Sequence, residues 1–120
     1  MAKNQNSKDY DLEERTLEFA RRSVKFYKGL SKTAINGEIG RQLIRAATSV
    51  GANYIEANEA LSKRDFLMRI KICRKEAKES GYWLKLIEMN NPDLRNEQEM
   101  LLGESVELMK IFGSILTKSQ

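Results

Sequence analysis

The sequence predicts an all-α protein, and more specifically an antiparallel, up-and-down four-helix bundle. Apolar side chains recur at steps of three and four residues in four successive segments, which is the spacing of one face of an α-helix. Short polar connections separate these segments, so consecutive helices should lie side by side and antiparallel. No segment alternates apolar and polar residues as a half-buried strand would. With 120 residues, we expect a flexible N-terminus over residues 1–10 and a single four-helix-bundle domain over residues 11–118.

The first two helices are predicted from their apolar periodicity and from the residues at their ends. Asp11 can cap the first helix, and Gly29 lies where that helix would stop. The segment of residues 30–36 is rich in small and polar residues and should form the connection, and the second helix should end near Ala60. The periodic positions are Leu12, Thr16, Phe19, Ala20, Ser23, Val24 and Tyr27 in the first helix, and Ile39, Leu43, Ala46, Ala47, Val50, Tyr54 and Ala57 in the second.

The third and fourth helices each follow a capping signal. Residues 62–65 form a capping box that opens the third helix, and the break at residues 90–93 contains the proline that closes it. A second box at residues 96–99 is predicted to open the fourth helix. The periodic positions are Phe66, Ile70, Cys73, Ala77, Gly81, Leu84 and Ile87, followed by Leu102, Val106, Met109, Phe112, Ile115 and Leu116.

The composition argues against most catalytic and metal-binding functions. The chain has no histidine and a single cysteine, Cys73, which falls on the apolar face of the third helix and is expected in the core. We therefore predict no enzyme activity, no catalytic residue, no metal site and no cofactor. No charged-then-apolar leader, no internal disulfide and no apolar run of roughly 20 residues is present, so a cytoplasmic protein without a membrane partner is expected.

Two helices carry more apolar surface than one bundle core requires. On the second helix, Ile44 and Ile55 belong to a second stripe beside the core stripe, together with Thr48 and Gly51. On the third helix the excess positions are Met68, Ile72, Trp83 and Leu86. A contiguous apolar patch on a soluble protein marks an association site, so we predict an interface between copies of the chain. The alternative is a wide core face in an irregular bundle.

A polar ridge follows the second helix. It consists of Gln42, Arg45, Ser49, Asn53 and Glu56. Most polar ridges are solvated faces, yet those favour Lys and Glu over Gln, Ser and Asn. Arg69, Glu76 and Glu79 on the third helix could bond to the ridge in a partly buried network that specifies register or assembly. An acid/base site is disfavoured, because no nucleophile, metal ligand or phosphate-binding loop accompanies the carboxylates.

A basic face is predicted on the third helix, in a chain whose net charge is +4. It consists of Arg64, Lys71, Arg74, Lys75, Lys78 and Lys85, with Tyr82 among them. Such a face can be an ordinary solvated helix surface. It can equally contact phosphates and release counterions from a nucleic acid, and because no base-reading motif accompanies it, binding would depend on shape and charge.

Most of the chain, roughly from Asp11 to Leu116, resembles a known family. The run Gln42-Leu-Ile-Arg-Ala-Ala-Thr-Ser-Val-Gly-Ala-Asn53-Tyr-Ile-Glu56-Ala, followed by Asp65-Phe-Leu and by Lys75-Glu-Ala-Lys-Glu-Ser-Gly-Tyr-Trp-Leu84, is similar to the bacterial four-helix-bundle family that includes the intervening-sequence proteins of the large-subunit ribosomal RNA gene. The most specific residues are those of the polar ridge, with Ala46. One departure is Tyr54-Ile-Glu-Ala57, where the family commonly has Ile-Ala-Glu-Gly, and the missing glycine implies a longer second helix or a changed turn.

The resemblance implies a non-enzymatic bundle that assembles into a ring, typically a pentamer. A more distant relative is the accessory protein of diversity-generating retroelements, which works with a reverse transcriptase and nucleic acid. The leading hypothesis is a homo-oligomeric bundle that binds structured RNA or another nucleic acid through the basic face. The alternative is a protein-interaction scaffold, or an accessory subunit of a nucleic-acid enzyme, that docks its partner through the polar ridge.

Overall fold

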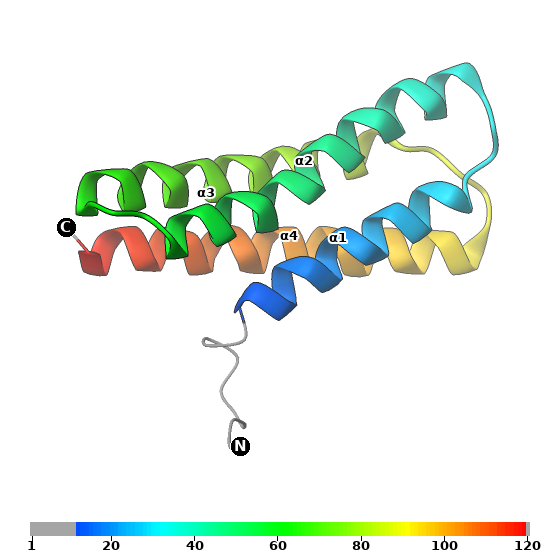
Figure 1. Cartoon of the computed structure of the whole chain (residues 1–120). Helices are drawn as coiled ribbons and strands as arrows, with labels where there is room; N and C mark the ends of the chain where they lie inside the picture. The colour runs from blue at the N-terminus through cyan, green and yellow to red at the C-terminus, as the bar shows by residue number, and fades with distance from the viewer. Residues whose placement is uncertain (1–11, 120) are drawn as a thin grey trace.

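The computed structural model describes residues 12–119, and within them it contains four helices and no strand (Figure 1). The helices are α1 (Leu12–Lys28), α2 (Ala34–Asn58), α3 (Lys63–Leu86) and α4 (Pro92–Ser119). The predicted all-α, up-and-down four-helix bundle is therefore confirmed. The expected flexible segment over residues 1–10 and the cap at Asp11 lie outside the described residues.

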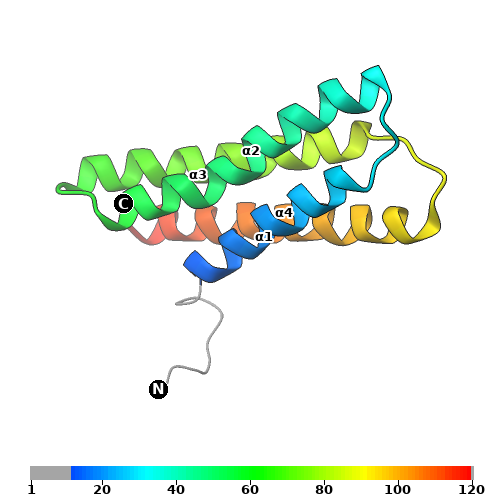
Figure 2. The ribbon, with the colours of Figure 1, turned by 45° about the vertical axis from the view of Figure 1, so that its right-hand side comes forward.

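Each helix packs against its neighbours in the sequence, and α1 and α4 close the bundle. Of the diagonal pairs, α2 and α4 meet inside the core, where the rings of Tyr54 and Phe112 lie 6.0 Å apart between centroids. The α1–α2 and α3–α4 connections lie together at one end, and the α2–α3 connection lies at the other end with the C-terminus (Figures 1 and 2). Since α1 has 17 residues and α4 has 28, α1 covers only part of the length of the bundle.

The core is apolar and contributed by all four helices. Its largest fully buried side chains are Phe19 and Phe26 of α1 and Phe112 of α4. Burying an aromatic or branched side chain contributes roughly 1.5–3 kcal/mol to folding, so these residues account for much of the packing between α1 and the other helices. The remaining core residues include Leu43, Val50, Ile70, Cys73, Leu84, Leu101 and Leu108.

Helix α2 begins earlier than the sequence predicts. The expected connection extended to Asn36, but α2 starts at Ala34, because the Thr33 hydroxyl accepts a hydrogen bond from the Asn36 amide at 3.1 Å. The Asn36 side chain is itself buried and donates to the Ser31 carbonyl at 3.1 Å. A threonine cap inside a polar stretch thus converts the end of the predicted connection into the first turn of the helix.

Helix α4 also begins earlier, at Pro92 rather than at the box of residues 96–99. The Asn91 side chain accepts hydrogen bonds from the amides of Asp93 at 2.9 Å and Leu94 at 3.3 Å, so Asn91 is the cap. Proline suits the first helical position, because its φ is already helical and no intrahelical partner exists there for an N–H group. The same residue that ends the connection therefore starts the helix.

The core face of α4 differs from the predicted one. The buried positions are Leu101, Ser105, Leu108, Phe112 and Leu116, whereas Val106 is 39% exposed. A close approach explains this register: a Cβ on Gly81 of α3 would lie 2.9 Å from the Ser105 hydroxyl oxygen. The small residues Gly81 and Ser105 let α3 and α4 approach at this point, which turns that side of α4 inward.

Two ion pairs that the sequence analysis missed hold α1 against α4. Arg15 donates to Glu104 from Nε at 2.7 Å and Nη2 at 3.0 Å, and Arg22 donates to Glu97 at 2.9 and 3.0 Å. Both pairs have the two-bond geometry that guanidinium and carboxylate groups favour. The matching seven-residue separations on the two helices were a signal in the sequence, since they place both partners on one edge of each helix.

Candidate nucleic-acid interface

The basic face lies on the solvent side of α3. All six cations and Tyr82 are exposed, whereas Ile70, Cys73, Ala77 and Leu84 on the opposite side of the helix are buried. This arrangement follows from the sequence spacing, because residues three, four and seven apart share one side of an α-helix. The structure therefore brings all seven predicted residues onto one convex surface.

The acidic residues in the middle of α3 are turned away from this surface. Glu76 is buried and pairs with Arg45 of α2 at 3.4 Å, and Glu79 pairs with the same guanidinium group. Within residues 12–119, none of the six cations of the basic face forms a salt bridge. The charges in the middle of α3 are thus separated: Glu76 and Glu79 bind α2, and the cations of the basic face remain exposed on the other side of the helix.

One member of the basic face, Arg74, lies against α4 beside Gly113. A Cβ on Gly113 would lie 3.8 Å from Cδ of Arg74 and 3.9 Å from its Nη1 atom. Arg74 therefore extends along α4 instead of directly outward. The basic face accordingly continues from α3 toward the surface of α4 near Gly113.

The polar ridge of α2 is bonded to α3. Asn53 donates to Ser49 and accepts a hydrogen bond from Arg69 Nη1 at 3.0 Å, while Arg45 bonds to Gln42 in addition to the two glutamates. The network that the sequence analysis considered between the ridge and Arg69, Glu76 and Glu79 is present. Glu56, the last ridge residue, is exposed. Two of the five ridge residues, Arg45 and Asn53, thus bond directly to α3, and Gln42 and Ser49 bond to these two within α2.

The residues predicted as an oligomer interface do not form one surface. Ile55 faces α1, in a groove of about 540 Å³ that it lines with Leu17 and Gly51. Leu86 lines a different hollow, at the end of the bundle where two connections meet. Ile44 lies on the same side of α2 as Gly51, by helical spacing. The excess apolar residues therefore belong to at least two faces of the bundle.

On α3, the predicted interface residues fall into two groups. Met68 and Ile72 lie near the start of the helix, and Trp83 and Leu86 lie near its end. Eleven residues separate Ile72 from Trp83, which corresponds to about 16 Å along a helix. Glu76 and Glu79 occupy the edge between the groups and are bonded to Arg45. The apolar stripe is thus interrupted by ion pairs.

The groove between α1 and α2 exposes apolar side chains of both helices. Leu17 is 43% exposed and Ile55 is 47% exposed, and Ala20, Gly51 and Ala52 also line the groove. Gly51 lets α1 approach α2 closely in this region, since a Cβ there would lie 3.1 Å from the Thr16 hydroxyl oxygen. The sequence analysis identified the α2 side of this groove but not Leu17.

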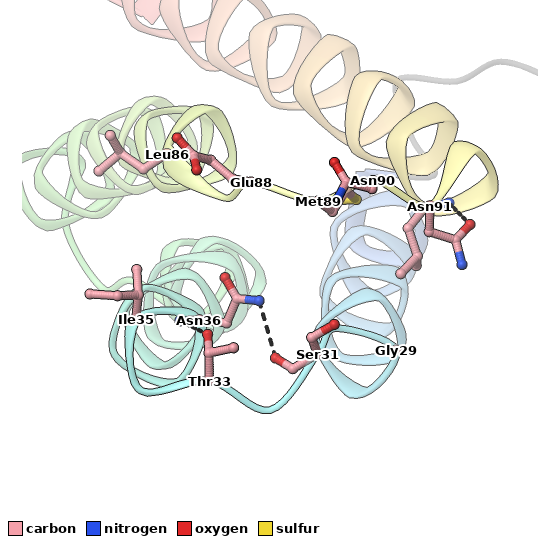
Figure 3. A pocket seen from close by; sticks show the side chains of 11 residues that line it. Gly29, Ser31, Thr33, Ile35, Asn36, Leu86, Glu88, Met89, Asn90 and Asn91 are labelled. Carbon is pink, nitrogen blue, oxygen red and sulfur yellow. Dashed lines mark hydrogen bonds between the residues drawn. The ribbon is translucent and has the colours of Figure 1, made fainter.

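A hollow of about 560 Å³ lies where the α1–α2 and α3–α4 connections meet (Figure 3). Asn36 points from α2 toward Ser31, Leu86 lies at the end of α3, and Glu88 and Asn90 belong to the connection that follows it (Figure 3). Since Thr33 and Asn36 are already bonded to the first turn of α2, the polar groups on this side of the hollow serve the helix start. We assign the hollow a structural role.

Cys73 is a core residue, as predicted. Its side chain is fully buried, and its thiol donates a hydrogen bond to the Val50 carbonyl at 3.4 Å. Burial raises the pKa of the thiol to about 12, so the group stays protonated and poorly nucleophilic at neutral pH.

Among the described residues there is no cluster of three or more metal-ligating side chains. None of the described helices has the length and hydropathy to cross a membrane.

Comparisons with known proteins identify the family. The model of the 23S rRNA-intervening sequence protein family matches residues 8–114. The chain belongs to this family. A crystal structure of a protein of unknown function from the S23 ribosomal protein family of Bacteroides thetaiotaomicron is similar over 88% of this chain and 97% of that one, with 36% identity and a TM-score of 0.77. A search of curated proteins gives no match.

These matches confirm the family resemblance that the sequence analysis drew from the polar ridge. They extend over all four helices, since the matched range of residues 8–114 runs from before α1 into α4. At the position where the family commonly has glycine, this chain has Ala57, which is buried inside α2. The helix continues past it to Asn58.

Proposed function

We propose that the protein is a non-enzymatic nucleic-acid-binding bundle that contacts structured RNA or another nucleic acid through the basic face. The observation that carries this proposal is the separation of charge on α3. Arg45 neutralises Glu76 and Glu79 on the inner edge, while six cations remain exposed on the outer side. Exposed cations close together release counterions from a nucleic acid, and this release supplies most of the non-specific binding energy.

The proposal is tested by charge reversal. The triple variant Arg74→Glu, Lys75→Glu, Lys78→Glu should abolish binding to a labelled structured RNA, measured by fluorescence anisotropy. The matched control reverses Lys25, Lys28 and Lys32, which are exposed on α1 and its following connection; α1 lies diagonally across the bundle from α3, with no Cα atoms of the two helices within 8 Å of each other. Circular dichroism and solution mass are recorded for both variants. Retained binding in the α3 variant, with its fold intact, would contradict the proposal.

We also propose that the chain self-associates, as a ring and typically a pentamer. Separate apolar surfaces support this: the α1–α2 groove with Leu17 and Ile55, and the apolar groups at the two ends of α3, where Met68 and Leu86 are exposed. Two different surfaces suit a heterologous contact, in which one surface of a copy meets the other surface of the next, and such contacts close into rings.

The self-association proposal is tested by solution mass. The variant Ile72→Ser with Trp83→Gln should give monomers by light scattering, and a variant of the α1–α2 groove, Leu17→Gln with Ile55→Gln, should do the same. The control is Val106→Gln on α4, which is exposed but outside both surfaces. An unchanged mass for both test variants would contradict the proposed interface.

The scaffold function is the second candidate. It assigns partner docking to the polar ridge, of which Glu56 remains exposed. Because Arg45 and Asn53 are bonded to α3, a protein partner would compete with an existing contact between helices. We therefore favour nucleic-acid binding, and failure of the charge-reversal test would transfer the preference to a protein partner.

A further inference from the structure

The cations of the basic face have a regular spacing that bears on the form of nucleic acid they bind. Arg64, Lys71, Lys78 and Lys85 are each seven residues apart on one uninterrupted helix, α3 (Lys63–Leu86). Seven residues correspond to about 10.5 Å along a helix, so these four cations form a row about 31 Å long. The row winds by only about 60° over that length, and it stays on one side of the molecule.

The surface that carries this row is convex and has no stacking platform. Proteins that bind single strands without sequence preference use a charged groove lined with aromatic side chains on which bases stack. Here the charged surface is the outside of a helix, and its one aromatic residue is Tyr82, which is 57% exposed. The Tyr82 ring meets Trp83 edge-on, with centroids 5.0 Å apart and an angle of 74°. The bases of a flexible single strand would therefore gain little stacking energy on this surface.

A duplex presents the complementary geometry. Its phosphates lie on a rigid rod, at one negative charge per about 1.7 Å of axis, and a row of about 31 Å would extend along roughly nine base pairs. Lysine acts on phosphate as a point charge without a fixed orientation. Four of the six cations are lysines, so they suit positioning contacts to phosphates more than reading of base edges.

We propose that the basic face binds the phosphate backbone of double-helical nucleic acid, with no dependence on base sequence. The contact is made by the row of four cations on α3 that are spaced seven residues apart. This proposal rests on the proposed nucleic-acid function and specifies its ligand as a duplex. The ligand chemistry is shared by duplex RNA and duplex DNA, and separate experimental arms distinguish the two.

The test compares four labelled probes of one sequence and one length, about 20 nucleotides or base pairs: duplex RNA, duplex DNA and the two single strands. At least one duplex should bind tenfold or more tightly than its own single strand, and a shuffled sequence should change the duplex affinity less than about twofold. A single strand that binds as tightly as its duplex would overturn this proposal and leave the nucleic-acid function standing. Absence of binding to all four probes would overturn both.

Two variants connect the result to the row. Lys71→Gln with Lys78→Gln should weaken duplex binding roughly 50-fold at about 0.1 M salt, from the loss of two phosphate contacts. The control Lys25→Gln with Lys28→Gln on α1 should change it less than about threefold. Tyr82→Leu tests for base stacking on this face, since loss of a stacking platform would cost roughly tenfold or more. A large loss in Tyr82→Leu, or none in the α3 double variant, would overturn the proposal.

Discussion

The guanidinium group of Arg22 forms two hydrogen bonds with the Glu97 carboxylate, from Nε at 2.9 Å and from Nη2 at 3.0 Å. This contact raises the pKa of Arg22, chiefly through the hydrogen bond to Glu97. A raised arginine pKa means that the stabilisation by this pair is fully present below the ordinary pKa of the group and is lost only in strong alkali. The pair therefore holds α1 on α4 throughout the neutral pH range.

The first prediction concerns the strength of this pair. A double-mutant cycle with Arg22→Gln and Glu97→Gln should give a coupling energy of about 0.5–1 kcal/mol at low salt, because the side chains are only 29% and 31% exposed. The coupling should fall in about 1 M salt. The control cycle uses Arg21 and Glu18, which lie 3.8 Å apart and are more than half exposed, and it should give nearly zero. Equal coupling energies in the two cycles would contradict the conclusion that the Arg22–Glu97 pair stabilises the contact between α1 and α4.

The second prediction concerns the contact between α1 and α2. A Cβ at Gly40 would lie 2.1 Å from Cε1 of Tyr27, whereas a Cβ at Gly37 would meet nothing within 4 Å. Gly40→Ala should lower the free energy of unfolding by about 1–3 kcal/mol, because the Tyr27 ring must move. Gly37→Ala, one turn away, should raise it by roughly 0.5–1 kcal/mol through helix propensity. Urea unfolding measures both, and an opposite order would refute this packing.

The third prediction concerns the thiol of Cys73. Native protein should not react with a thiol reagent at about pH 8, and unfolded protein should react fully. The pKa of the thiol rises on folding from 9.0 to about 12, so its contribution to stability is present below pH 9.0 and is lost as the pH rises from there toward 12. The stability difference between the wild type and Cys73→Ala should shrink over that window. A constant difference, or rapid labelling of the native protein, would contradict the buried thiol.

The sequence predicted the helices and most of the core, but not every helix start. Ser62 is an isolated cap signal and was identified correctly: its hydroxyl accepts from the Asp65 amide at 3.1 Å. Thr33 and Asn91 were missed because each lies among other polar residues that can also cap. The core face of α4 was misplaced because apolar pairs such as Leu101 with Leu102 leave two faces open, and only the contact with Gly81 selects one.

In the candidate site, too, the sequence predicted what depends on spacing within one helix and did not predict what depends on packing between helices. The basic face depends on spacing within one helix, so the sequence alone placed all of its residues together. The predicted interface residues depended on how neighbouring helices pack, and the structure distributes them over separate faces. The pairs of α1 with α4 were missed because the two members lie 75 and 89 residues apart in the sequence.

The most direct test of the central claim is the salt dependence of nucleic-acid binding by the wild type and by the Lys71→Gln, Lys78→Gln variant. The logarithm of the binding constant should fall linearly with the logarithm of the salt concentration, and the variant should have a slope shallower by about 1.8, or 0.9 for each lost phosphate contact. That result would establish the basic face as the phosphate-binding surface. Parallel lines for the two proteins, or no binding at low salt, would contradict it.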